Sequence, residues 1–430
     1  MIVLGFLFKS RNGNEIYEHP KKHYEHSAKK IEDQDQLPTR YFRESPSLNS
    51  HHLHWHDVVG QEMERFGEIF YYMHRQLLVR YEAELLSDGL NMTHTFCIDE
   101  WDLPIADGYD PRLGSWWTPR PGGIVMGTVE ERSTLKRFYK TLMSEARSGG
   151  MYTEGRDKGI DRLGRLVEKT LHNVGHAYLM AMGGNGVMGS AVASLRDPIF
   201  YRWHTCLEDI FREYKESLGP YTDQDLNFEG VEVTEVEVNT DGHSSANTLF
   251  TFMELDEVKL RNIDGDLDFE YDQDVPLKTI KYQRLNHHHF QYKLSVHSDF
   301  DTEGVIRVFL KPYGAEGNKI ILEMDHFYTK LKSGPNMIER DEASSPHLSK
   351  SGLSLTDLQD KLMNGLLSKD QFDWAGCGWP VSLNVPRGKV GGMVWQLVVM
   401  VSSILEREQG RVEEKWESAK DYSWSYCVWC

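Results

Sequence analysis

Two histidine pairs with helical spacing constrain this chain more than any other feature of its sequence. His52 and His56 lie four residues apart in HHLHWH, and His172 and His176 repeat that spacing in LHNVGH. On an α-helix, residues four apart lie on one face, one turn apart. Each pair can therefore present two imidazoles to a common point, which is typical of a metal-binding helix.

A single histidine follows each pair on an amphipathic stretch. His74 lies in FYYMHRQ and His204 in FYRWHTC. A lone histidine on a buried stripe is usually a core residue whose polar atoms are satisfied, but a matched pair upstream favours a ligand. The chain thus offers two sets of three imidazoles, each set from two helices: His52, His56 and His74, then His172, His176 and His204.

A donor set made only of imidazole limits which metal can bind. Imidazole suits copper, zinc, iron and nickel. Three neutral nitrogens without a carboxylate or a thiolate leave the bound ion positive and open. Two such sets facing each other would form a pocket for a small diatomic molecule between two metals. A redox-active copper pair fits this donor set best, although the spacing alone leaves zinc open.

Apolar periodicity predicts the helices that carry the histidines. In residues 61–86, apolar side chains recur at three- and four-residue steps, as on a buried helical stripe. Further helices are expected over 132–146 and 159–182. Another is expected over 197–218, with Asp as its N-cap and Pro at its first position.

Aromatic residues near the single histidines are expected to wall the pocket against bulk water. Phe200 lies one turn before His204 and is expected to pack against it. Phe70 and Trp203 complete this predicted apolar wall. Cys206 points away from His204 on the helix, and we interpret it as a core cysteine.

From residue 228 onward the apolar pattern changes from helical to alternating. Strings such as VEVTEVEV, FQYKLSVHS and VIRVFLKP predict six or seven strands, which suggests an antiparallel β-sandwich. A triplet, His287 to His289, lies in this region. Alternation along a strand would split these side chains between two faces, so a metal role is not favoured for them.

These patterns predict an α+β multidomain chain, in which a helical domain with a four-helix bundle core precedes the β-sandwich. We expect four segments: a polar lead over 1–37, a helical dicopper domain over 38–226, a β-sandwich over 227–415 and a tail over 416–430. The opening MIVLGFLF lacks a basic region and has a short apolar part, unlike a signal peptide. We interpret it as a stray or truncated start, with a secretion signal as the alternative.

Charge and cysteine content limit the partners and the compartment. The chain has 66 acidic and 48 basic side chains and a net charge of −18, which argues against nucleic-acid or membrane binding. No apolar run reaches the roughly 20 residues that a membrane span needs. Among five cysteines, Cys377 could pair with Cys427 or Cys430 in an oxidising compartment, or all five could be free thiols.

Several strings also resemble a known superfamily, the type-3 copper proteins of the arthropod hemocyanin and prophenoloxidase group. These strings are LNSHHLHWH, LHNVGH, GVMGSAVASLRDPIFYRWHTCLEDIFREYK, IRVFLKP, DHFYTKLKSGPNMIER and CGWP. The resemblance covers roughly residues 38–430, and the run over 186–215 is its most specific part. Some later strings look closer to chelicerate hemocyanins than to insect prophenoloxidases.

The resemblance implies a fold, a cofactor and a location. It implies an immunoglobulin-like C-terminal domain and two copper ions that bind dioxygen between them as a bridging peroxide. The first copper would be held by His52, His56 and His74, and the second by His172, His176 and His204. An extracellular protein of the hemolymph is expected, in homo- or hetero-oligomers of the hexamer type.

Relatives usually carry a further N-terminal helical domain, which in hemocyanins places a shielding phenylalanine in the pocket; this chain begins almost at the copper domain.

Three functions fit this resemblance. The first is an oxygen carrier, and the second a phenoloxidase or catechol oxidase that converts o-diphenols to o-quinones. The third is a copper-free storage protein, against which six intact ligands argue. An oxidase would benefit from a base, for which Glu168, one turn before His172, is a candidate unless it is a surface carboxylate. Asn173 matches an asparagine that helps to hold a water in tyrosinase-like relatives, unless it is merely an exposed polar residue.

Overall fold

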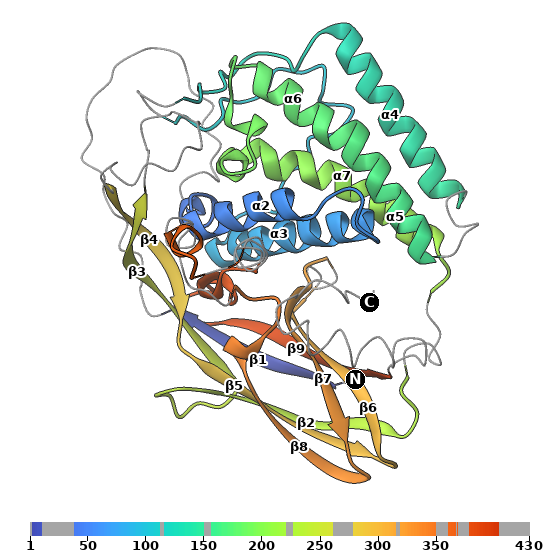
Figure 1. Cartoon of the computed structure of the whole chain (residues 1–430), viewed down its shortest axis with the longest axis vertical. Helices are drawn as coiled ribbons and strands as arrows, with labels where there is room; N and C mark the ends of the chain where they lie inside the picture. The colour runs from blue at the N-terminus through green and yellow to red at the C-terminus, as the bar shows by residue number, and fades with distance from the viewer. Residues whose placement is uncertain are drawn as a thin grey trace.

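A layer of helices lies on two β-sheets in this chain (Figure 1). The structure, a computed structural model, describes residues 2–10, 38–111, 116–149, 156–220, 227–260, 278–314, 319–349, 360–366, 368 and 378–403 of the 430-residue chain. Cys377, Cys427 and Cys430 lie outside these ranges, so the expected disulfide among them stays a prediction. Within these ranges, no helix combines the length and the apolar character that crossing a membrane would require.

The helices begin and end at strong local signals. They are α1 (Arg40–Arg43), α2 (Pro46–Val58), α3 (Phe66–Asp88), α4 (Val129–Ser148), α5 (Arg156–Val167), α6 (Asn173–Ala181) and α7 (Pro198–Ser217). The side chain of Asp197 accepts a hydrogen bond from the Ile199 amide and Pro198 occupies the first turn, as the sequence predicts for α7. Thr128 and Glu131 form a capping box at the start of α4. Gly89, with φ of 72°, ends α3.

The helix predicted over 159–182 is divided by a π-helical turn. Glu168–His172 is π-helical and joins α5 to α6. Such turns are often found at functional sites. Here the turn carries His172, the first histidine of the second pair.

Two glycines allow α3 and α5 to approach backbone to backbone. A Cβ atom on Gly164 would lie 2.0 Å from the carbonyl oxygen of Gly67, and one on Gly67 would lie 1.9 Å from the carbonyl oxygen of Asp161. The Gly67 amide also donates a 2.7 Å hydrogen bond to Asp161 Oδ1. Only glycine fits at this crossing, which sets the distance between the helix of His74 and the segment that leads to His172.

Within the described residues, the strands form a six-stranded and a three-stranded sheet, ordered β4-β3-β1-β9-β6-β7 and β2-β5-β8. Their bounds are β1 (Ile2–Ser10), β2 (Val231–Thr240), β3 (Thr248–Leu260), β4 (Lys278–His287), β5 (Phe290–Ser298), β6 (Thr302–Pro312), β7 (Leu322–Leu331), β8 (Gly334–Asp341) and β9 (Met393–Ser403). Burial alternates along β5, with Tyr292, Leu294 and Val296 in the β-core. The predicted α+β class is confirmed, although the sequence patterns did not identify β4 and β8 as strands.

The start of the chain departs from the expected polar lead. Ile2–Ser10 forms β1, which pairs antiparallel with β9, with Phe6 opposite Trp395, and parallel with β3, with Leu7 opposite Thr248. An apolar run of this length is typical of a strand with neighbours on both sides. This segment therefore belongs to the large sheet, and the other expected domain boundaries stay predictions.

Helix α3 connects the helical layer to the β-sheets. Leu77 belongs to the helical core, whereas Val79 and Ala83 belong to the core of the β-part. The buried guanidinium of Arg80 donates hydrogen bonds to the Leu383, Asn384 and Glu323 carbonyls. The helix that carries His74 is thus fixed from both sides.

Candidate metal centre

The structure brings all six predicted histidines into one largely buried cluster between α2, α3, α7 and the segment formed by the π-helical turn Glu168–His172 and α6. Ring centroids are 4.6 Å apart for His52 and His56, and 5.5 Å apart for His56 and His74. The second set is equally close, with 4.6 Å between His172 and His176 and 5.1 Å between His172 and His204. The two sets meet where His74 stacks on His204 at 4.9 Å.

The outer nitrogen of five of these rings is held by the protein. Nδ1 donates to a carbonyl oxygen at 2.7–2.9 Å in His52 (Ala191), His74 (Phe70), His176 (Met188) and His204 (Phe200), and to the Asn173 side chain in His172. Because Nδ1 carries the proton in these bonds, the lone pair lies on Nε2. This is the arrangement that orients metal-ligating histidines in general.

The inner nitrogens have no protein partner to satisfy them. Nε2 of His74, His172, His176 and His204 is buried without a hydrogen bond. Nε2 of His52 and Nε2 of His56 face each other at 3.1 Å. A buried polar atom left unpaired costs about 1–3 kcal/mol, so a cluster of such atoms indicates a site that binds a ligand. The donor set fits copper, which accepts imidazole nitrogen readily.

Burial keeps the imidazoles neutral. It lowers the pKa of His52 and of His176 to about 4. Burial and the neighbouring imidazoles hold the pKa of the other four rings well below the ordinary value. Metal ions bind the neutral ring, so no proton has to leave at neutral pH.

His74 lies at the junction of the two sets. Three-nitrogen groups with all ligand atoms within 4.8 Å of one another are His52, His56 and His74, and also His74, His172 and His204. The first group is the predicted first set, whereas the second contains His74 in place of His176. His74 is thus close enough to both sets to belong to either of them.

Aromatic side chains enclose the cluster. Phe200 stacks on His204 at 3.8 Å and Phe70 lies 4.4 Å from His74, and both phenylalanines are buried. Trp55 also lies against His56, at 5.0 Å. Trp55 was not predicted to line the pocket, although its position beside His56 in HHLHWH was the available signal.

Trp203 lies apart from this wall. It packs on Trp101 at 5.6 Å and on Phe96 at 6.3 Å. A Cβ atom on Gly175 would lie 2.0 Å from Cζ2 of Trp203. Trp203 therefore sets the spacing of α6 and α7, and the glycine of LHNVGH is what permits this close contact.

A polar chain runs outward from His172. Asn173 Oδ1 accepts from His172 Nδ1 at 2.9 Å, and its Nδ2 donates to Glu168 Oε1 at 2.9 Å. Gln61 donates to the other Glu168 oxygen at 2.8 Å. Glu168 is only 9% exposed, so the interpretation as a surface carboxylate is wrong. The π-helical turn brings Glu168 alongside Asn173, five residues later.

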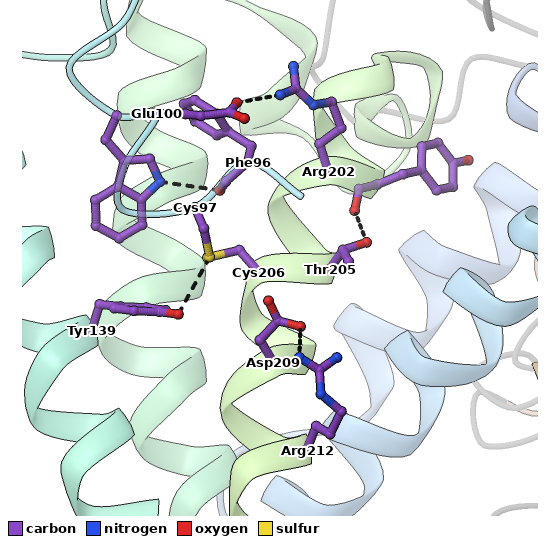
Figure 2. Close-up of a disulfide and its surroundings, with 11 residues drawn as sticks. Phe96, Cys97, Glu100, Tyr139, Arg202, Thr205, Cys206, Asp209 and Arg212 are labelled. Atoms are coloured by element: carbon purple, nitrogen blue, oxygen red, sulfur yellow. Dashed lines mark hydrogen bonds and ion pairs between the residues drawn. A yellow bond between two sulfur atoms is a disulfide. The ribbon is translucent and has the colours of Figure 1, made fainter. Parts of the chain in front are cut away.

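Cys206 lies in the helical core, as predicted, but it forms a disulfide, so the alternative that all five cysteines are free thiols is wrong. Cys97 and Cys206 are bonded across 109 residues, and this bond ties the segment after α3 to the turn of α7 that carries His204 (Figure 2). Arg202 reinforces the junction, since it donates to the His94 carbonyl and pairs with Glu100 at 2.6 Å. The partner of Cys206 could not be found from local spacing.

A helical layer that buries six neutral imidazoles beside a β-sheet part defines a binuclear metal protein. Residues 8–184 match the family model described as "Hemocyanin, copper containing domain", and residues 220–429 match "Hemocyanin, ig-like domain". The chain belongs to the hemocyanin and phenoloxidase superfamily of type-3 copper proteins. The predicted family, the copper-containing domain and the immunoglobulin-like domain are confirmed.

Individual relatives include both hemocyanins and phenoloxidases. One hemocyanin from Scutigera coleoptrata is 30% identical over 90% of this chain and 64% of its own length. Phenoloxidase 1 of Holotrichia diomphalia is 31% identical over 90% of this chain and 63% of its own length. A scorpion hemocyanin structure matches with a TM-score of 0.73 at 28% identity, over 92% of this chain and 67% of that one. The chain thus spans just under two thirds of these two curated relatives.

Proposed function

We propose that the chain holds two copper ions at the histidine cluster and binds dioxygen reversibly there, as an oxygen carrier. His52, His56 and His74 would hold one ion, and His172, His176 and His204 the other. When bound, copper supplies the reversible redox chemistry that dioxygen binding needs. The observation that carries the proposal is the set of buried, unpaired Nε2 atoms, whose opposite nitrogens are held by backbone carbonyls or Asn173.

The apolar surroundings support a carrier. Phe70 and Phe200, at most 2% exposed, lie directly against ligand rings, so water is kept from the cluster on that side. Excluding water favours reversible binding, because it removes the proton source that would convert reduced oxygen to products. A Scutigera hemocyanin and the Holotrichia phenoloxidase 1 resemble this chain to nearly the same degree, so it is the apolar wall that favours a carrier.

The second candidate is a phenoloxidase or catechol oxidase, and the polar chain beside His172 favours it. Glu168 fixes the amide of Asn173 next to a ligand ring, a place from which the pair could orient a water or accept a phenol proton. His56 and His176 are the two of the six histidine residues that are not fully buried, and they would lie on the side that a phenol approaches. A copper-free storage role would leave the orphan Nε2 atoms unexplained.

Oxygen uptake by the reduced, copper-loaded chain separates the two candidates. Catechol is added midway through the measurement. One stoichiometric uptake, reversed when oxygen is removed and unchanged by catechol, is expected of a carrier. Sustained uptake with quinone formation would overturn the carrier and support the oxidase. No uptake by a chain shown to hold about two coppers would contradict both.

Location and assembly follow from the same proposal. The Cys97–Cys206 disulfide is typical of an oxidising compartment, and we infer an extracellular protein of the hemolymph. We also infer assembly into hexamer-type oligomers, as expected for a carrier. Sedimentation or light scattering of the copper-loaded chain tests this, and a strict monomer would contradict the assembly.

A further inference from the structure

A second group of side chains of metal-ligating type lies in the β-part, at one end of the β2-β5-β8 sheet. Figure 1 labels the three strands of this sheet. Asp241 directly follows β2, His289 directly precedes β5 and Asp341 ends β8. Glu342 begins the short 3-10 helix η6 (Glu342–Ser344). The backbone holds these segments together, since the Asp241 amide donates to the His289 carbonyl at 2.9 Å.

The imidazole of His289 lies between carboxylates on both of its nitrogens. Nε2 is 2.9 Å from Asp341 Oδ2 and 4.0 Å from Glu342 Oε2. One ligand atom from each of these three residues lies within 4.8 Å of the other two. Nδ1 is 3.0 Å from Asp241 Oδ2. A histidine that binds a metal through one nitrogen usually donates the other N–H to a carboxylate, and Asp241 occupies that position.

Glu342 provides independent evidence for a ligand at this place. Its side chain is 4% exposed, and its Oε2 is buried without a hydrogen-bond partner. An ionised carboxylate is not buried without a compensating charge. A cation bound beside this oxygen would balance its charge.

The site is open to solvent on the side of His289. Because the side chains of His289 and Asp341 are each 38% exposed, an ion can reach Nε2 from solvent.

We propose that His289, Asp341 and Glu342 bind a divalent transition-metal ion, with Asp241 orienting the imidazole. The ion would displace the Nε2 proton of His289 and coordinate the unpaired oxygen of Glu342. Two carboxylates and one imidazole suit Mn²⁺ or Zn²⁺, unlike the all-imidazole set of the dicopper centre. The site would join three segments at the end of the small sheet. It also assigns a role to the last member of the 287–289 triplet, for which the sequence did not favour one.

Titration of the copper-loaded chain with Mn²⁺, followed by the loss of the free-ion electron paramagnetic resonance signal, tests the proposal. Mn²⁺ is the probe because imidazole sites bind it weakly. We expect one Mn²⁺ per chain, displaced by Zn²⁺. Glu342→Gln and Asp341→Asn should abolish saturable binding, and Asp241→Asn should weaken it about 10–100-fold. His297→Gln is the matched control, because His297 contacts the exposed Asp299 at 3.4 Å without a buried carboxylate.

Each result separates the alternatives. Loss of binding in Glu342→Gln and Asp341→Asn, with full binding in His297→Gln and with oxygen uptake intact, supports the site. The proposal is overturned if the unmodified chain shows no saturable Mn²⁺ binding, or if binding survives in Glu342→Gln. Hydrogen bonds alone would then hold His289 and the carboxylates together. Binding retained in His52→Ala would show that the site is independent of the dicopper centre. If Glu342→Gln does not fold, the Asp241→Asn variant provides the test. An Mn²⁺ affinity of Asp241→Asn equal to that of the unmodified chain would overturn the proposal.

Discussion

Tyr72, two residues before His74 on α3, donates a hydrogen bond from its hydroxyl to the carboxylate of Glu323 on β7. The same glutamate accepts from His326 Nδ1 at 2.7 Å, and its amide donates to Gln76 Oε1 at 3.0 Å. One buried side chain thus connects the helix of a proposed copper ligand to the immunoglobulin-like part. We expect the metal centre and the β-sheet to unfold together.

Replacing Glu323 tests this connection through its pH dependence. Burial alone would raise the pKa of Glu323, but His326, His347 and Tyr72 lower it to about 2. The unfolded chain therefore binds the proton more readily, so this carboxylate stabilises the fold above about pH 4.5 and the contribution disappears as pH falls toward 2. We expect Glu323→Gln to lower the free energy of unfolding by on the order of 2–3 kcal/mol at pH 7, and by much less near pH 2.5.

Urea unfolding between pH 2.5 and 7 measures this difference. Glu232→Gln, at an exposed position on β2, is the control and should change little at any pH. If Glu323→Gln lowers the free energy of unfolding by the same amount at every pH, the interaction does not involve the charge of Glu323.

Removing the Cys97–Cys206 bond should destabilise the α7 segment. The bond closes a loop of 109 residues, and closing a loop of this length restricts the unfolded chain strongly. We expect the Cys97→Ala, Cys206→Ala double variant to lose about 2–5 kcal/mol of stability. Thermal unfolding with and without reductant measures this loss. A reductant effect that persists in the double variant would mean that another disulfide accounts for it.

A methyl group at Gly175 should disturb the geometry of the metal centre without touching a ligand. Alanine favours helix by about 1 kcal/mol over glycine, but here its Cβ would lie 2.0 Å from Trp203. We expect Gly175→Ala to cost about 1–3 kcal/mol and to reduce copper binding, because α6 must move away from α7. Gly391→Ala, where nothing lies within 4 Å, is the control. Full copper content in Gly175→Ala would show that the helices adjust without moving the histidines.

Substituting one histidine from each set tests the division of ligands between two ions. We expect His52→Ala and His204→Ala each to retain about one copper per chain, since each should empty one three-nitrogen set and spare the other. Both should lose the absorption of the oxygenated centre, which requires both ions. Copper analysis and optical spectra measure these outcomes. Loss of both coppers in either variant would mean that the two sets do not bind copper independently. The position of His74, close to both sets, would account for such a result.

Local patterns in the sequence were sufficient to predict much of the helical part. The four-residue spacing of both histidine pairs, the apolar stripe that includes His74 and the Asp197–Pro198 start of α7 depend only on neighbours along the chain. Helical geometry converts such spacing into a shared face. Alternation likewise predicted β5 and β6, because successive side chains on a strand point to opposite faces.

The remaining features depended on contacts between distant segments. Periodicity along the chain does not encode the pairing of Ile2–Ser10 with β3 and β9, the partner of Cys206 or the burial of Glu168. Each of these depends on which distant segments the fold places next to one another. The same holds for His289, whose carboxylate neighbours come from the ends of β2 and β8. By itself the sequence determined which side chains could act as ligands and on which helices they lie. The tertiary structure decided which of them converge, because convergence depends on packing between segments rather than on order along the chain.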